Sequence, residues 1–237
     1  NNLAIAYGGA NGVPRNDTKA LEWFRRASDT GLARATYSLA QYHEQGRGMA
    51  ADLKAAALLY RLALEQGDER GALRLGYLAG QGALDTLVPP HFSVDWALAA
   101  ARTGDADALA WLARQAEDGL RPAQTAYGEM LLTLEGRAPE AAAAFERAAL
   151  AGDVPAQFQL GTLYTTGTGV PLDYVAAHLW LNIAATSGHK EAAETRELIG
   201  NLMTPEQISS AQTQAREFFD TASERLPEAA AKNRTRP

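Results

Sequence analysis

Apolar and small residues recur along this chain in pairs of helical stripes that are separated by glycine-rich turns. The clearest copy spans residues 160–188. Its first half places Leu160, Gly161 and Tyr164 on one helical face. Its second half carries apolar residues at positions 177, 180, 181 and 184, which is again a helical spacing. Two short amphipathic helices cannot bury these stripes alone, so the pattern predicts a helix pair that packs on its neighbours.

The residues of the turn between the two stripes each have an expected structural role. Gly167 and Gly169 are expected at positive φ, where they end the first helix. Asp173 is expected to cap the second helix. The small residue at position 161 is expected to let the second helix approach closely.

Weaker copies of the same pattern lie upstream, at residues 35–67 and 2–31. Their closing glycines, Gly31 and Gly67, are 36 residues apart, and Gly104 follows after a further 37. A fixed period of this size is typical of a stacked array. The sequence therefore predicts an all-α, right-handed α-solenoid of about five antiparallel helix pairs with a C-terminal capping helix.

We expect one solenoid over residues 1–224 and a disordered tail over 225–237. Its expected repeats lie at about 1–31, 32–67, 68–104, 105–152 and 153–188, with a cap at 189–224. Thr204, Pro205 and Gln207 form a capping-box start for the last helix.

The middle of the chain departs from the period. The segment 84–92 replaces the usual glycine loop and contains two prolines, which exclude a helix there. In the segment 105–152, Gly119 closes too early for a helix pair. Either one helix is unpaired here or the array changes its stacking direction.

Composition narrows the function classes. The formal charge of −6 and the pI near 5.3 argue against a nucleic-acid partner, because phosphate binding favours a basic surface. The absence of cysteine excludes disulfides and thiolate metal sites. No run of about 18 apolar residues is present, so we expect no membrane span.

Taken together, these residues resemble the Sel-1-like repeat, a subgroup of the tetratricopeptide-like α-solenoids. The resemblance rests on a small residue after Leu, Tyr three positions later, a Gly-x-Gly-Val-Pro-x-Asp turn and a Trp between alanines, as in residues 160–188. Residues 188–193 and 203–207 are similar to the usual ending of bacterial members. The chain departs from the pattern at His43, at Ala10–Asn11 and in the loops 84–92 and 119–122.

The resemblance implies a function in protein binding. Such proteins are typically non-catalytic adaptors that hold protein complexes together, which is the first expectation here. An immunity protein that neutralises a secreted toxin, such as a lipase, is the alternative, and a hydrolase of cell-wall-type substrates is the lesser one. No cofactor is expected. Because the chain starts inside a repeat, we expect that a leader was removed or lies upstream, and a periplasmic or secreted location in bacteria.

The resemblance also indicates where a partner would bind. In tetratricopeptide-like arrays the first helix of each pair lines a concave groove. The positions that correspond to it here are Arg34, Tyr37, Gln41, Glu44, Arg70, Tyr77, Asp107, Arg114, Glu117, Thr125, Glu129, Phe158 and Thr162. Tyr and Arg are frequent anchors of interfaces. The alternative is that these are ordinary solvated side chains.

Other conspicuous residues are expected to be structural. Trp23, Trp96 and Trp180 share one repeat position and are expected in the core, whereas Trp111 is expected to be partly exposed. His43-Glu44 lacks the second histidine of a zinc-protease motif, so His43 is expected in the core. No nucleophile with a base stands out, and we expect no catalysis and no metal site.

Overall fold

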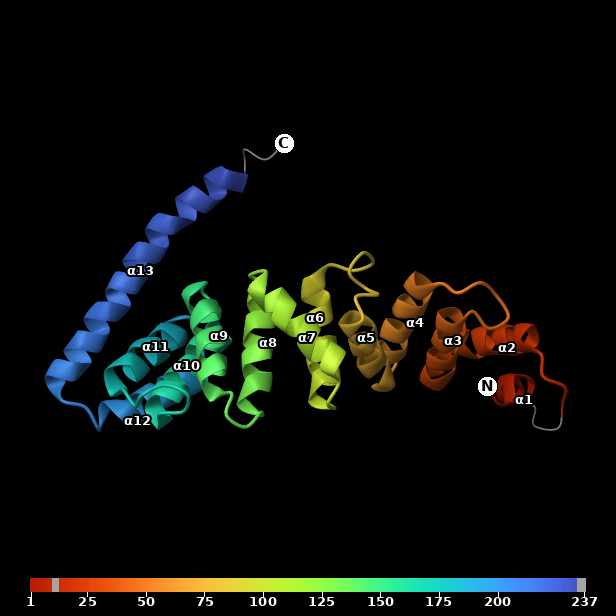
Figure 1. Ribbon diagram of the computed structural model, residues 1–237, viewed down its shortest axis with the longest axis horizontal. Coiled ribbons are helices and arrows are strands. Elements are labelled where there is room, and N and C mark those ends of the chain that lie inside the picture. The colour runs from red at the N-terminus through yellow and green to blue at the C-terminus, as the bar shows by residue number, and fades with distance from the viewer. Residues whose placement is uncertain (10–12, 234–237) are drawn as a thin grey trace. The chain divides into compact units, whose positions relative to one another are not determined.

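The structure is a computed structural model that describes residues 1–9 and 13–233, with side chains described up to Thr221. All regular elements in these ranges are α-helices (Figure 1). The chain divides into two compact units, unit 1 at Asn1–Ala126 and unit 2 at Tyr127–Pro237. The predicted all-α fold of stacked helix pairs is confirmed.

The helices are distributed over the two units. Unit 1 contains α1 (Asn2–Gly9), α2 (Asp17–Asp29), α3 (Ala33–Gln45), α4 (Leu53–Glu65), α5 (Arg70–Gly80), α6 (Pro90–Arg102) and α7 (Ala106–Glu117). Helix α8 (Arg121–Leu132) crosses from unit 1 into unit 2. Unit 2 continues with α9 (Ala138–Leu150), α10 (Val154–Thr166), α11 (Tyr174–Thr186), α12 (Lys190–Gly200) and α13 (Pro205–Asn233). Helix α6 begins at Pro90, inside the segment 84–92 from which a helix was expected to be excluded, because proline fits the first turn of a helix.

Glycines set the distance between helices in unit 1. Helices α3 and α4 form one pair, α5 and α6 form the next, and α5 also packs on α4. A Cβ on Gly76 would lie 2.0 Å from the Trp96 carbonyl oxygen within the second pair. A Cβ on Gly71 would lie 2.3 Å from the Tyr60 carbonyl oxygen across the two pairs. Both helix contacts therefore require a residue without a side chain.

The glycine turns are built as predicted. Gly167 and Gly169 have φ angles of 70° and 73°. A Cβ on Gly169 would lie 2.3 Å from the Ala138 carbonyl oxygen, so the turn lies directly on the start of α9. A Cβ on Gly48 would lie 2.8 Å from the backbone carbonyl carbon of Asp17, at the start of α2. The second glycine of each turn thus fits its loop against the preceding pair.

The predicted caps are present. The Asp173 carboxylate accepts hydrogen bonds from the backbone N–H groups of Val175 (2.9 Å) and Ala176 (3.0 Å). At the start of α13, the backbone N–H of Thr204 donates to Gln207 Oε1 (2.9 Å). In return, the Gln207 N–H donates to Thr204 Oγ1 (3.3 Å), which completes the capping box.

Helix α7 stands as a single helix between two pairs, one of the two alternatives that the sequence left open. It packs on α5 and α6 as the first helix of a pair would. Toward the next helix, α8, it behaves like the second helix of a pair. Helix α8 contacts α7 through the same hydrogen bond by which α10 contacts α9. Gln124 Nε2 donates to the Ala116 carbonyl (3.1 Å), just as Gln157 Nε2 donates to the Ala149 carbonyl (3.1 Å).

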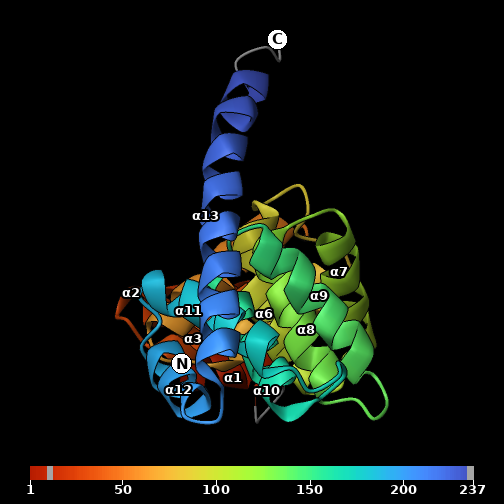
Figure 2. The same cartoon turned by 90° about the vertical axis from the view of Figure 1, so that its left-hand side faces the viewer.

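The core of unit 2 contains the predicted packing stripe of α11, and the C-terminal helix α13 packs on it. Phe145, Leu160 and Trp180 belong to one buried cluster. Phe218 of α13 meets the Trp180 ring edge-on, with centroids 5.5 Å apart. Figures 1 and 2 show the first turns of α13 near α11 and α12, with the rest of the helix extending past them. The helix continues to Asn233, through most of the segment expected as a disordered tail.

The tryptophan predictions are partly wrong. Trp111 was expected to be partly exposed, but it is fully buried, and its Nε1–H donates to Asp85 Oδ1 (3.0 Å). Trp180 is buried as predicted, whereas Trp23 and Trp96 are only half-buried. In α2 the neighbouring Phe24 takes the core position. His43 is in the core, as predicted.

Candidate functional site

The first helices α3, α5 and α7 of unit 1 display predicted groove residues at repeat spacing. Arg34, Arg70 and Asp107 occupy one equivalent position, and all three are exposed. Gln41, Tyr77 and Arg114 occupy another, where Arg114 is exposed and the other two are half-buried. We call this set the first-helix surface, which comprises Arg34, Tyr37, Gln41, Arg70, Tyr77, Asp107, Arg114 and Glu117.

A stacked pair of side chains forms the best-defined part of this surface. The Arg70 guanidinium lies over the Tyr37 ring, 4.3 Å from its centre. Asp68 holds the guanidinium there through two hydrogen bonds of 2.8 and 2.6 Å. The hydrogen bonds from Arg70 keep the pKa of the Asp68 carboxyl below its usual value. Arg70 is thus fixed in one orientation while its side chain stays about half exposed.

Arg34 and Arg70 face a shared shallow hollow. The hollow lies between the beginnings of α3 and α5 and is also lined by Ala33, Gly67 and Glu69. Under the Arg70 guanidinium, the Tyr37 ring packs against the Tyr60 ring, with centroids 5.2 Å apart. Tyr37 is half-buried by this contact, so it supports the surface more than it projects from it.

Glu44, another predicted groove residue, joins two helix pairs instead of facing a partner. It accepts hydrogen bonds from Tyr60 Oη (2.6 Å) and from the Arg74 guanidinium. Its side chain is only 11% exposed. Burial is the largest influence on its pKa and would raise it, but the bonds from Arg74 and Tyr60 outweigh burial and lower the pKa. Burial and the Glu44 bond raise the pKa of Tyr60.

Sequence reasoning missed Tyr60, Arg74 and Asp68, which organise this region. Arg74 directly precedes Leu75, one step from the positions that the family pattern assigns to the groove. Tyr60 lies on the packing stripe of a second helix. Ser38 and Arg74 lie 36 residues apart, at equivalent positions on successive first helices. The change from serine to a charged residue at this position was the available signal for Arg74.

The remaining predicted residues have varied surroundings. Thr125 is buried and is not part of an exposed face. Phe158 is half-buried and stacks on the His189 ring at 4.3 Å. Thr162 donates a hydrogen bond to the Phe158 carbonyl (3.0 Å) within α10. Glu129 is half-buried and, like Phe158 and Thr162, belongs to unit 2.

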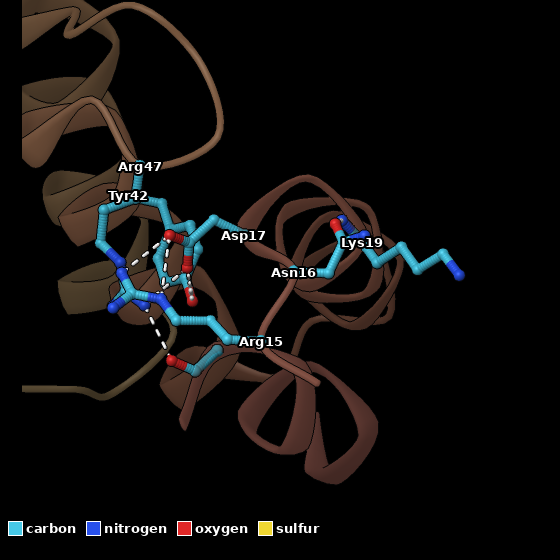
Figure 3. A network of polar contacts seen from close by, with 7 residues as sticks. Arg15, Asn16, Asp17, Lys19, Tyr42 and Arg47 are labelled. Carbon is cyan, nitrogen blue, oxygen red and sulfur yellow. Dashed lines mark hydrogen bonds and ion pairs between the residues drawn. The ribbon is translucent and has the colours of Figure 1, made fainter. Parts of the chain in front are cut away.

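A second polar network joins the first two repeats (Figure 3). The Arg47 guanidinium donates to Asp17 Oδ1 (2.7 Å) and to the Gly8 carbonyl (2.9 Å), and it stacks 4.2 Å from the Tyr42 ring centre. Arg15 binds the other oxygen of Asp17 (2.8 Å). Arg47 comes from the glycine turn after α3 and Asp17 starts α2, so this network stabilises repeat stacking.

Among the described residues, no group of three or more His, Asp or Glu side chains is placed to hold a metal ion. No helix in the described part of the chain has the length and apolar character needed to cross a membrane.

The repeat signature decides the family. The Sel1 repeat model matches residues 1–32, 33–68, 70–105 and 154–189, more than half of the chain. The chain belongs to the Sel1 repeat family. The unmatched stretch 106–153 contains the single helix α7 and the α8–α9 region. Sel1 repeats are generally protein-interaction modules.

This Sel1 repeat chain is similar to fungal regulators over part of their length. It is 41% identical over 71 residues to the chitin synthase regulator SKT5 of Malassezia restricta, which covers 30% of this chain and 5% of that protein. It is 29% identical over 201 residues to chitin synthase regulatory factor 3 of Schizosaccharomyces pombe, which covers 82% of this chain and 20% of that protein. The chain thus spans a fifth or less of these relatives.

Two solved structures are also similar to this Sel1 repeat chain. One is a protective antigen with an SLR fold from uropathogenic Escherichia coli (24% identity, TM-score 0.48, covering 100% of this chain and 63% of that one). The other is a Sel1 repeat protein from Oxalobacter formigenes (23% identity, TM-score 0.40, covering 91% and 85%).

Proposed function

We propose that this protein is a non-catalytic adaptor that binds a partner protein through the first-helix surface of unit 1. The observation that carries the proposal is the Arg70 guanidinium, held by Asp68 on the Tyr37 ring while half of its side chain remains exposed. An arginine fixed in this way loses little side-chain entropy when a partner binds. Arginine on an aromatic base is also a frequent interface anchor.

Charge indicates the kind of partner segment that fits this surface. Arg70 is paired with Asp68, and Arg74 is paired with Glu44. Arg34 and Arg114 are exposed, as are Asp107 and Glu117 of the same surface. Although the whole chain is acidic, Arg34 and Arg114 are exposed cations outside the two ion pairs and are therefore suited to carboxylates of a partner segment.

Comparative capture from the native cells tests the proposal. Wild-type protein and an Arg34→Glu/Arg114→Glu variant serve as parallel baits, and mass spectrometry identifies what each retains. A true partner should be retained by the wild type and strongly reduced on the variant. A Lys190→Glu/Arg216→Glu variant makes the same charge change at exposed sites in unit 2 and should retain the partner.

A partner that is retained equally by all three baits would contradict the proposed surface. The partner's identity also separates the adaptor from the toxin-neutralising alternative, because the latter requires a secreted enzyme as partner and loss of that enzyme's activity in the complex. A periplasmic or secreted location stays a prediction.

A further inference from the structure

A separate apolar hollow lies on unit 1 between α4, α6 and the irregular loop that joins α5 to α6. We call it the α4–α6 hollow, and it is lined mainly by Lys54, Leu58, Arg61, Leu87, Val88 and Trp96. The Glu44 network and the first-helix surface use none of these side chains. Leu58 is exposed, whereas Leu87, Val88 and Trp96, the last of which was expected in the core, are half-buried.

The apolar surface extends beyond the hollow itself. Leu58 is 49% exposed, and Leu62, one turn later on α4, is 38% exposed. An adjoining hollow shares Lys54 and Leu87 and continues toward Met49 and Leu53. Isolated exposed leucines are ordinary, but a continuous exposed apolar surface marks an interaction site.

The irregular loop forms a preformed wall of this hollow. Leu84 is buried to 1% exposure, and Asp85 accepts the hydrogen bond from the buried Trp111 indole (3.0 Å). The backbone N–H groups of Leu87 and Val88 both donate to the Leu84 carbonyl, at 2.8 and 3.0 Å. These anchors hold Leu87 and Val88 in place, so binding there requires little further ordering.

Two basic side chains frame the apolar surface. Lys54, Leu58 and Arg61 lie at i, i+4 and i+7 of α4 and therefore share one helical face. Arg61 reaches Glu65 at 3.6 Å, and both side chains are more than half exposed, so this ion pair is weak. The hollow thus combines an apolar floor with cationic edges about two helical turns apart, roughly 10 Å along α4.

We propose that the α4–α6 hollow is a second docking site that takes an acidic amphipathic helix of a partner protein. One apolar side chain of that helix would enter the hollow, and a second one turn away would lie against the exposed Leu58 and Leu62. Flanking carboxylates would face Lys54 and Arg61. A helix fits better than an extended strand, because the described part of unit 1 contains only helices and offers no sheet edge for pairing.

Two synthetic helical peptides of about 15 residues test this proposal. Both carry Leu and Phe at i and i+4; one has Glu at the flanking positions and the other has Lys. Fluorescence anisotropy with the whole protein should show the Glu peptide binding at least about tenfold more tightly. A Lys54→Glu/Arg61→Glu variant should reverse this preference, whereas Lys190→Glu/Arg216→Glu should leave it unchanged.

A Leu58→Ser variant adds an independent check on the apolar contact, and it should weaken the Glu peptide at least about threefold. The site assignment fails if the two peptides bind equally, or if charge reversal at Lys54 and Arg61 leaves the preference unchanged. It also fails if sedimentation shows self-association that Leu58→Ser abolishes, since a second copy of this chain would then occupy the hollow. Lys54 and Arg61 are exposed, so their charge reversal remains decisive even if Leu58→Ser destabilises the fold.

Discussion

At the scale of single residues, the most sharply constrained positions are glycines at helix contacts and polar groups at helix starts. The sequence alone predicted the roles of Gly167 and Asp173, because each depends on a few neighbours along the chain. The repeat pattern predicted the close approach at Gly161, where an added Cβ would lie 2.7 Å from Leu181 Cγ of α11. It did not predict the burial of Trp111. That burial depends on Asp85, which lies 26 residues away in a loop without a repeat counterpart.

Gly76→Ala should be strongly destabilising. The new Cβ would lie 2.0 Å from the Trp96 carbonyl oxygen, and backbone cannot yield there without moving α6 away from α5. Overpacking of this kind costs about 1–3 kcal/mol of unfolding free energy. Gly200→Ala is the matched control, because nothing lies within 4 Å of a Cβ at that helical glycine. Urea denaturation should show unchanged or slightly increased stability for the control, and equal stability of both variants would disprove the close contact.

Stability should decrease as the pH falls from 7 to about 5.5. Burial, followed by the charges of Arg25 and Arg196, lowers the pKa values of His43 and His178 below 6.5. The unfolded chain therefore binds protons more readily than the folded one, so stability is lost as the pH falls through the ordinary histidine pKa. The measurement compares urea midpoints at both pH values for the wild type and a His43→Gln/His178→Gln variant. The urea midpoint of the variant should decrease less between the two pH values than that of the wild type. An equal decrease would show that these histidines do not cause the loss of stability.

At the scale of elements, the helix pairs were predictable from periodicity, but their joints were not. Stripe spacing and turn glycines set the existence of each helix. The hydrogen bonds that Tyr60 and Arg74 donate to Glu44 depend on how α3, α4 and α5 pack together. In the sequence, Glu44 therefore looked like a free groove residue. Gly119 ends α7 too early for a helix pair. From the sequence alone, this left two alternatives, an unpaired helix or a change of stacking direction.

The Tyr60–Glu44 hydrogen bond should show measurable coupling between α3 and α4. Tyr60 is fully buried, and Glu44 accepts from its hydroxyl at 2.6 Å. A double-mutant cycle with Tyr60→Phe and Glu44→Gln should give a coupling free energy of about 0.5–3 kcal/mol. Tyr7→Phe with Glu44→Gln is the control cycle and should be additive, because Tyr7 packs in the cluster around α1 and α2 instead. Additivity in the first cycle would show that the bond contributes nothing.

At the scale of the whole molecule, the family was predictable and the partner was not. The repeat signature identified a Sel1 array, and such arrays bind proteins. Periodicity does not show which exposed residues bind. The predicted first-helix positions include Glu44, which joins two helix pairs, the buried Thr125 and the half-exposed Arg70. Tyr37 is likewise half-buried under Arg70. Its replacement would change stability as well as binding, so the binding test uses Arg34 and Arg114 instead.

The most direct test of the central claim is the affinity of the captured partner for charge-reversed first-helix surfaces, measured by calorimetry. Arg34→Glu/Arg114→Glu changes only exposed side chains. Its free energy of unfolding should therefore differ from that of the wild type by no more than about 0.5 kcal/mol, and the two melting curves should nearly coincide. Its affinity should fall at least about tenfold, while Lys190→Glu/Arg216→Glu should bind normally. A folded Arg34→Glu/Arg114→Glu protein that binds its partner with wild-type affinity would show that the first-helix surface of unit 1 is not the interface.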